Sequence, residues 1–158
     1  MITDEKEHLY TTAVMWTGNT GQGTKTYTSY ERSYTLSING KKDIQCSSDA
    51  PFRGDTSKHN PEDLFLAAVS SCHMLWYLHL CSDNQIVVTA YSDHAVGKMI
   101  QTDKGGHFKE VTLYPSVTIT DGSKVALANS LHQEANKHCF IANSLNFKVY
   151  HKPNCKSI

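Results

Sequence analysis

Two of the five cysteines lie where a predicted helix would position a thiol for nucleophilic or redox chemistry. Cys72 is midway along an apolar stretch, and Cys139 follows a second predicted helix, where a turn or a new helix start would present it. A free cysteine in apolar surroundings usually packs as a small hydrophobic side chain. Reactivity at Cys72 therefore requires a nearby cation or hydrogen-bond donors that favour the thiolate.

The three remaining cysteines have no motif around them, and we interpret them as packing or surface thiols: Cys46, Cys81 and Cys155. Cys81 lies nine residues after Cys72, which at about 100° per residue places it on the opposite face of a helix. These two thiols therefore cannot pair with each other. An odd number of cysteines without tight spacing also disfavours a secreted disulfide framework, so we expect free thiols in a reducing cytoplasm.

Other site chemistries have little support in the sequence. The nine histidines form no His-x-x-x-His pair and the cysteines form no Cys-x-x-Cys pair, so no metal site is expected. Gly18, Gly21 and Gly23 lack the Gly-Lys-Ser/Thr ending of a phosphate loop, so neither a nucleotide nor another cofactor is expected. A Cys-His hydrolase would need His73 or His138 as its base, but adjacent side chains on a helix do not face each other.

The length and charge of the chain limit its class. At 158 residues it suits a single domain, 1–158, with a sizeable core. Fifteen basic residues balance fifteen acidic ones, so no large field of one sign would attract nucleic acid or an anionic membrane. Residues 1–7 are polar and acidic, so we expect no export signal and a cytoplasmic protein. A neutral or apolar small molecule is the better class of partner.

The first third of the chain is predicted to be rich in strands. β-branched and aromatic residues favour strands over 9–16, 24–29, 34–38 and 42–47. Asn39-Gly40 is a strong hairpin turn signal between the last two of these.

The clearest element is a helix that begins at Asn60-Pro61-Glu62-Asp63, with Asn as the N-cap, Pro at the first helical position and acids in the first turn. Apolar residues over 64–80 occupy nearly every face, so we expect a helix enclosed on all sides. Polar interruptions leave this stretch short of the roughly 20 apolar residues that span a bilayer.

The rest of the chain predicts strands over 86–91, 111–120 and 147–151, with a hairpin turn at Lys104-Gly105-Gly106. A second helix is expected over 123–138, with Leu127, Leu131 and Ala135 on its buried stripe. Paired strands separated by helices indicate the α+β class.

The segment 60–73, NPEDLFLAAVSSCH, resembles the long NPEELxxAAxxxC signature of the OsmC/Ohr family, in its OsmC-like subgroup. The family comprises osmotically inducible protein C and organic hydroperoxide resistance proteins. Residues 21–24 resemble its early Gly-x-Gly-Thr turn, Arg53 its arginine shortly before the signature, and Cys139 its second cysteine. These matches span nearly the whole chain.

The resemblance implies a thiol-dependent peroxidase that reduces organic hydroperoxides. Cys72 would be the attacking cysteine, Cys139 the resolving one, and Arg53 with Glu62 the pair that activates the thiol. Arg32 is the only other arginine that could take the activating role. An external dithiol would reduce the resulting disulfide. A second interpretation is an apolar-ligand binding or redox-sensing protein that keeps the fold without efficient turnover.

The resemblance also implies antiparallel sheets that wrap long central helices in an intertwined homodimer. Ten residues of straight helix separate Glu62 from Cys72 by about 15 Å, so Glu62 would serve the partner's cysteine unless the helix bends. If Phe65, Val69, Leu75 and Trp76 line the Cys72 face, a bulky organic peroxide would be preferred over hydrogen peroxide.

Overall fold

The computed structural model describes residues 6–158, and its chain forms two compact units, Met1–Leu64 and Phe65–Ile158. The expectation about the acidic start of the chain falls mainly on residues 1–5, outside the described residues. The single domain expected over 1–158 stays a prediction.

Unit 1 is built on a three-stranded antiparallel sheet with the strand order β1-β2-β3. Its strands are β1 (Ala13–Trp16), β2 (Tyr34–Ser37) and β3 (Ile44–Cys46), followed by the 3₁₀ helix η1 (Ala50–Phe52). The predicted Asn39-Gly40 turn is confirmed, because Gly40 has a φ of 75° and the Lys41 N–H donates to the Ile38 carbonyl at 3.0 Å.

The strand expected over 24–29 is wrong, because this segment consists of turns and bends. Side chains bind the backbone in place of a neighbouring strand. The Asn19 side-chain oxygen accepts from the N–H groups of Gly21 and Gly23, at 2.9 and 3.0 Å. The Ser29 hydroxyl accepts from the Thr26 N–H and donates to the Gly23 carbonyl. Such local bonds compete with a strand ladder.

The long helix α1 (Pro61–Asp83) begins where the sequence predicts, with the Asn60 side-chain oxygen accepting from the Asp63 N–H at 2.7 Å. Its burial differs from the expectation. Only every fourth residue is buried, in a stripe that contains Val69, His73, Tyr77 and Cys81. The expectation of a helix enclosed on all sides is therefore wrong for the single chain, which buries only one face of α1.

By length and composition α1 could cross a membrane, contrary to the expectation that its apolar stretch is too short. Core helices of soluble proteins meet the same criterion. The buried stripe includes a histidine, a tyrosine and a cysteine, which pack inside the protein in unit 2.

Unit 2 contains two three-stranded sheets, with the strand orders β4-β7-β9 and β5-β6-β8. The strands are β4 (Val88–Ser92), β5 (Val96–Thr102), β6 (Gly105–Leu113), β7 (Ser116–Ile119), β8 (Lys148–His151) and β9 (Asn154–Ser157). The last two strands each join an antiparallel pair and run parallel to their neighbour, β8 beside β6 and β9 beside β7. The other pairs are antiparallel.

Of the three strands predicted in this unit, two correspond to β4 and β8 and the third is split at a proline, whereas β5 was not predicted. The turn at Gly105 is confirmed, since β5 and β6 pair there and this glycine has a φ of 123°. The single strand expected over 111–120 is split at Pro115, which has no N–H to donate to a ladder. The two pieces join different sheets. The strand expected over 147–151 is β8, whereas β9 was not predicted.

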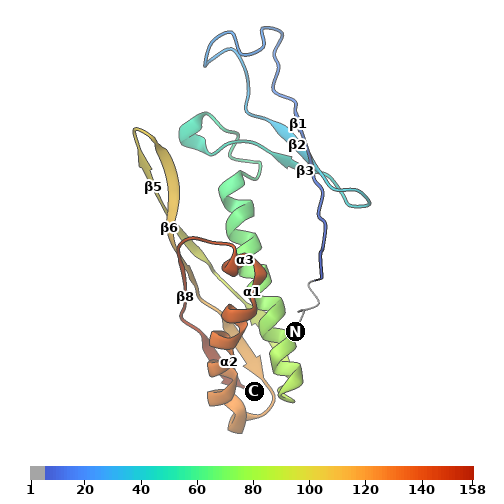
Figure 1. Ribbon diagram of the computed structural model, residues 1–158, viewed down its shortest axis with the longest axis vertical. Coiled ribbons are helices and arrows are strands. Elements are labelled where there is room, and N and C mark those ends of the chain that lie inside the picture. Colours follow the sequence, from blue (N-terminus) through green and yellow to red (C-terminus); the bar gives the residue numbers. More distant parts are fainter. Residues whose placement is uncertain (1–5) are drawn as a thin grey trace. The chain divides into compact units, whose positions relative to one another are not determined.

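Two further helices complete unit 2: α2 (Val125–His138), preceded by the 3₁₀ helix η2 (Gly122–Lys124), and the short α3 (Phe140–Asn143). Figure 1 shows α2 and α3 beside α1. The predicted helix over 123–138 is confirmed, but its buried face is Ala128, Leu131, His132 and Ala135, and Leu127 is 41% exposed. The stripe is thus rotated from the predicted one.

The core of unit 2 has two apolar clusters along α1. Near the end of α1, Tyr77 and Cys81 pack with residues of α2, β7 and β9. Near its start, Val69 packs with Val111, Leu113 and Val149 of β6 and β8. The α+β class is confirmed, and α1 is the element on which both clusters are built.

Candidate active site

Cys72 and Cys139 lie next to each other, one on α1 and the other at the start of α3. Cys139 is completely buried and Cys72 is half-buried. The Cys139 Sγ accepts a hydrogen bond from the Ala142 N–H at 3.4 Å, which holds the thiol at the first turn of α3. Both cysteines are free thiols. Residues 67 positions apart in the sequence are thus brought together.

The surroundings of Cys139 keep it protonated at neutral pH. Burial raises the pKa of its thiol to about 11, a hydrogen bond with the Cys72 thiol acts in the same direction, and the Ala142 N–H partly opposes both. A protonated thiol is a poor nucleophile. Since Cys72 is also the more accessible of the two, it is the cysteine that an incoming molecule meets first.

An apolar hollow of about 300 Å³ begins one helical turn after Cys72 and is lined by Leu75, Trp76, His79 and Phe140. Trp76 is one helical turn after Cys72, and Phe140 directly follows Cys139. The Trp76 ring meets the edge of the Phe140 ring at 5.6 Å between centroids. We call these four residues the Trp76 hollow. It offers an apolar surface beside the thiols.

Two of the four predicted pocket residues lie elsewhere. Leu75 and Trp76 line the hollow, as expected. Val69 is completely buried in the core, and the Phe65 ring packs on the Phe108 ring at 4.7 Å. The prediction is wrong for Phe65 and Val69, because both belong to the face of α1 that packs against β6 and β8.

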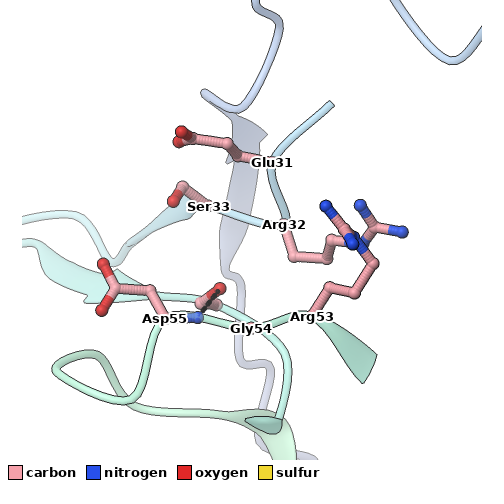
Figure 2. Close-up of a pocket in the computed structure, with 7 residues that line it drawn as sticks. Glu31, Arg32, Ser33, Arg53, Gly54 and Asp55 are labelled. Carbon is pink, nitrogen blue, oxygen red and sulfur yellow. Dashed lines mark hydrogen bonds between the residues drawn. The ribbon is translucent and has the colours of Figure 1, made fainter. Parts of the chain in front are cut away.

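The other predicted site residues belong to unit 1. Arg53 is exposed and follows η1 in a left-handed conformation, with a φ of 64°. It lines a pocket of about 260 Å³ together with Arg32, so both candidate arginines occupy one place (Figure 2). Glu62 is half-buried in the first turn of α1. Among residues 6–158 no ion pair joins Glu62 to Arg53.

A cluster of three histidines was not predicted, of which His73 and His132 are buried and His151 is half-buried. His73 Nε2 and His132 Nδ1 are hydrogen-bonded at 3.0 Å, and the His151 ring stacks on His73 at 4.5 Å. The Tyr77 ring stacks on His132 at 3.9 Å. Each histidine has one ring nitrogen that is buried and lacks a partner in the described part of the chain. The three come from α1, α2 and β8, so no local spacing could reveal them.

Burial keeps His73 and His132 neutral at pH 7. It lowers the pKa of His73 to about 3 and that of His132 to about 4, and the neighbouring His151 acts in the same direction on both. The pKa of His151 is also lowered by burial, with Asp93 in opposition. Within residues 6–158 no group of three or more histidine, cysteine or acidic side chains is arranged to hold a metal ion.

Comparisons with known proteins agree with this architecture. Residues 54–152 match the model of a family described as OsmC-like protein. A structure of an OsmC-like protein of unknown function from Vibrio cholerae is 28% identical, with a TM-score of 0.80, and covers 94% of this chain and 100% of its own. No curated protein sequence matches the chain.

Two organic hydroperoxide resistance proteins share the fold at lower identity. The protein from Elizabethkingia anophelis is 17% identical with a TM-score of 0.67, covering 97% of this chain and 100% of its own. The protein from Legionella pneumophila is 21% identical with a TM-score of 0.67, covering 96% and 100%.

Proposed function

The chain belongs to the OsmC-like protein family, and from this premise we propose that it is a thiol-dependent peroxidase that reduces organic hydroperoxides with Cys72 and Cys139. The contact between these two thiols is the observation that carries the proposal. The structural relatives from Elizabethkingia anophelis and Legionella pneumophila, which are named for organic hydroperoxide resistance, support the class of substrate.

In the proposed reaction the Cys72 thiolate attacks the peroxide oxygen farther from the organic group. The O–O bond breaks, Cys72 becomes a sulfenic acid, and the organic part leaves as an alcohol after taking up a proton. The Cys139 thiol then attacks the sulfenic sulfur, which forms the disulfide and releases water. An external dithiol reduces this disulfide by exchange and restores both thiols.

The difference between the two thiols supports this order of events. A sulfenic acid at Cys72 would form beside a thiol that is already in contact with it, so condensation needs only a small movement. Cys139 is buried and protonated until that step, which protects it from direct oxidation. The Trp76 hollow supplies apolar surface for the organic group of the peroxide.

The activating groups in this proposal are Arg53 and Glu62, with Arg32 as the alternative arginine. A guanidinium near Cys72 would enlarge the thiolate fraction and stabilise the departing oxygen. Because Glu62 and Cys72 are about 15 Å apart along a straight helix, we propose that Glu62 serves the cysteine of a second copy in an intertwined homodimer. A stable, active monomer in sedimentation at micromolar protein would contradict the dimer.

We further propose a cytoplasmic protein that needs no bound cofactor and no nucleic acid or membrane partner. The free state of all five cysteines fits a reducing compartment. The balanced charge of the chain offers no field for a polyanion.

The test is peroxide consumption by the purified protein with a dithiol reductant, using cumene hydroperoxide and hydrogen peroxide in parallel. We expect kcat/KM to be at least about tenfold higher for cumene hydroperoxide, since each 100 Å² of buried apolar ligand contributes about 2.5 kcal/mol before binding costs. Equal use of hydrogen peroxide would contradict the substrate class. A single oxidation that the dithiol does not reverse would indicate a redox sensor or ligand-binding protein instead.

A further inference from the structure

The pocket of unit 1 gathers the chain's only two arginines, although they are 21 positions apart in the sequence. Seven residues line it, and they come from three segments of unit 1: Glu31, Arg32, Ser33, Ser47, Arg53, Gly54 and Asp55. Figure 2 shows the Arg32 and Arg53 guanidinium groups pointing toward one another on the same side of the pocket. Two like charges repel each other there unless an anion lies between them.

Arg32 is held in place before any ligand arrives. Its guanidinium lies between the rings of Tyr27 and Tyr30, at 4.2 and 4.1 Å from their centroids. Nη1 donates to the Tyr30 carbonyl at 2.6 Å, and Nη2 donates to the Tyr27 carbonyl at 2.7 Å. A guanidinium has five N–H groups, so three remain for a ligand. Little side-chain freedom is left to lose on binding.

The backbone at Arg53 is equally well defined. Arg53 has a φ of 64°, an unusual conformation for a residue with a side chain, and its N–H donates to the Ala50 carbonyl at 3.0 Å. The next residue must be glycine, because a Cβ on Gly54 would lie 1.5 Å from the Ser48 carbonyl oxygen. The Arg53 guanidinium itself has no hydrogen bond or ion pair within residues 6–158. A strained residue with a free cationic side chain indicates a binding role.

The acidic residues of the pocket do not neutralise the arginines. Asp55 pairs with Lys58 at 3.2 Å and accepts from the Ser57 hydroxyl at 2.7 Å, and these contacts, Ser57 first, lower the pKa of Asp55 to about 2. The Glu31 carboxylate points away from the guanidinium groups in Figure 2. With Asp55 and Lys58 cancelling, two arginines against Glu31 leave one positive charge.

We propose that Arg32 and Arg53 form a binding site for the carboxylate of a small monoanion. The planar fork of a guanidinium matches a carboxylate with two parallel hydrogen bonds, so two converging forks suit one carboxylate group. A single excess positive charge favours a monoanion over a dianion such as phosphate. The same arginines are the ones proposed to activate the Cys72 thiol, so this inference rests on the proposed function and deepens it by adding a ligand class to that site.

The two arginines make the test simple, because protein labelled with ¹⁵N-arginine has only two Nε–H signals in an NMR spectrum. Sodium benzoate is titrated at constant ionic strength, with inorganic phosphate and chloride in parallel. We expect both signals to shift along one common binding curve with benzoate, and at least about tenfold weaker binding of phosphate. The Cys72→Ser variant should give the same curve, because carboxylate binding needs the arginines and not the thiol. Failure of benzoate to bind while the unchanged protein still consumes peroxide would overturn this inference alone.

Variants locate the site. Arg53→Lys keeps the charge and removes the fork, and it should weaken benzoate binding at least about tenfold, read from the remaining Arg32 signal. Lys42→Gln removes a charge from an exposed residue of the same unit and should leave the curve unchanged. Movement of one signal only, equal shifts with chloride, phosphate binding as tight as benzoate, or an unchanged curve in Arg53→Lys would each overturn the proposal.

Discussion

Cys72 and His73 are consecutive residues on α1, yet they occupy opposite kinds of environment. Cys72 is half-buried beside Cys139 and one turn from Trp76, which lines an apolar hollow. His73 is 1% exposed and lies within a cluster with His132 and His151. One residue step turns a helix by about 100°, which is enough to separate the two faces.

The difference shows how one helix can serve two tasks. The face with His73 and Tyr77 packs into the core of unit 2, and burial keeps His73 neutral. On the other face, the Trp76 ring packs against His138 at the end of α2 and Phe140 of α3, and Cys72 stays half-buried, so a small molecule can approach it. In our proposal reactivity and stability therefore belong to different sides of α1, and variants can separate them.

The largest expected effect on activity comes from the face of α1 that carries Cys72 and Trp76. Cys72→Ser should lower peroxidase kcat/KM by roughly a thousandfold or more, because the nucleophile is removed. Cys81→Ser, on the opposite face of α1, is the matched control and should keep the activity while lowering stability. Steady-state kinetics with cumene hydroperoxide make the comparison, and comparable losses in both variants would mean that activity follows stability alone.

Cys139→Ser should consume one equivalent of peroxide and then stop, provided that the dithiol reductant reacts only slowly with a sulfenic acid. The oxidised Cys72 would then have no neighbouring thiol, so excess peroxide should drive it to sulfinic acid. Intact-mass spectrometry would show a gain of two oxygen atoms at Cys72. Full steady-state turnover in this variant would remove Cys139 from the resolving role.

For the face of α1 that carries His73 and Tyr77, we predict that the protein loses stability in mild acid. His73 and His132 have pKa values lowered to about 3 and 4, so below pH 6.5 the unfolded chain takes up protons that the folded chain does not. Each such histidine costs up to about 1.4 kcal/mol of unfolding free energy per pH unit as pH falls from 6.5 toward those values. Urea unfolding at pH 7 and pH 5 measures the slope.

His132→Phe should flatten that slope, since phenylalanine keeps the stack on Tyr77 and does not titrate. His79→Gln is the control, because the His79 side chain is 60% exposed and should contribute little. An identical slope in His132→Phe and the unchanged protein would contradict the neutral, buried state of the cluster.

The smallest effect should come from the Trp76 hollow. Trp76→Ala should raise KM for cumene hydroperoxide by about three- to tenfold, with little change for hydrogen peroxide, because it removes apolar contact from the ligand. Phe65→Ala should instead cost roughly 3–5 kcal/mol of stability without changing selectivity. If both variants change KM alike, the hollow does not bind the organic group.

Local signals in the sequence were reliable guides to the elements. The Asn60 cap, the Asn39-Gly40 turn and the helix over 123–138 all depend on neighbouring residues, and all are confirmed. The strand over 24–29 failed because the Asn19 and Ser29 side chains bind the backbone there. Composition cannot reveal such bonds.

The candidate site was predictable only where a motif marked it. The signature around Cys72 and the position of Cys139 were visible in the sequence, and the two cysteines are neighbours in the structure. The joint pocket of Arg32 and Arg53 and the histidine cluster depend on contacts between distant segments, which no spacing rule reports. The roles of Arg53 and Glu62 toward Cys72 stay predictions.

The most direct measurement is a map of the disulfide formed in the unchanged protein by one equivalent of cumene hydroperoxide. The protein is oxidised, its remaining thiols are blocked, and its peptides are identified by mass spectrometry without reduction. We predict one disulfide, between Cys72 and Cys139, with Cys46, Cys81 and Cys155 recovered as blocked thiols. A disulfide between any other pair, or five blocked thiols with the peroxide left unconsumed, would contradict the proposed two-cysteine peroxidase.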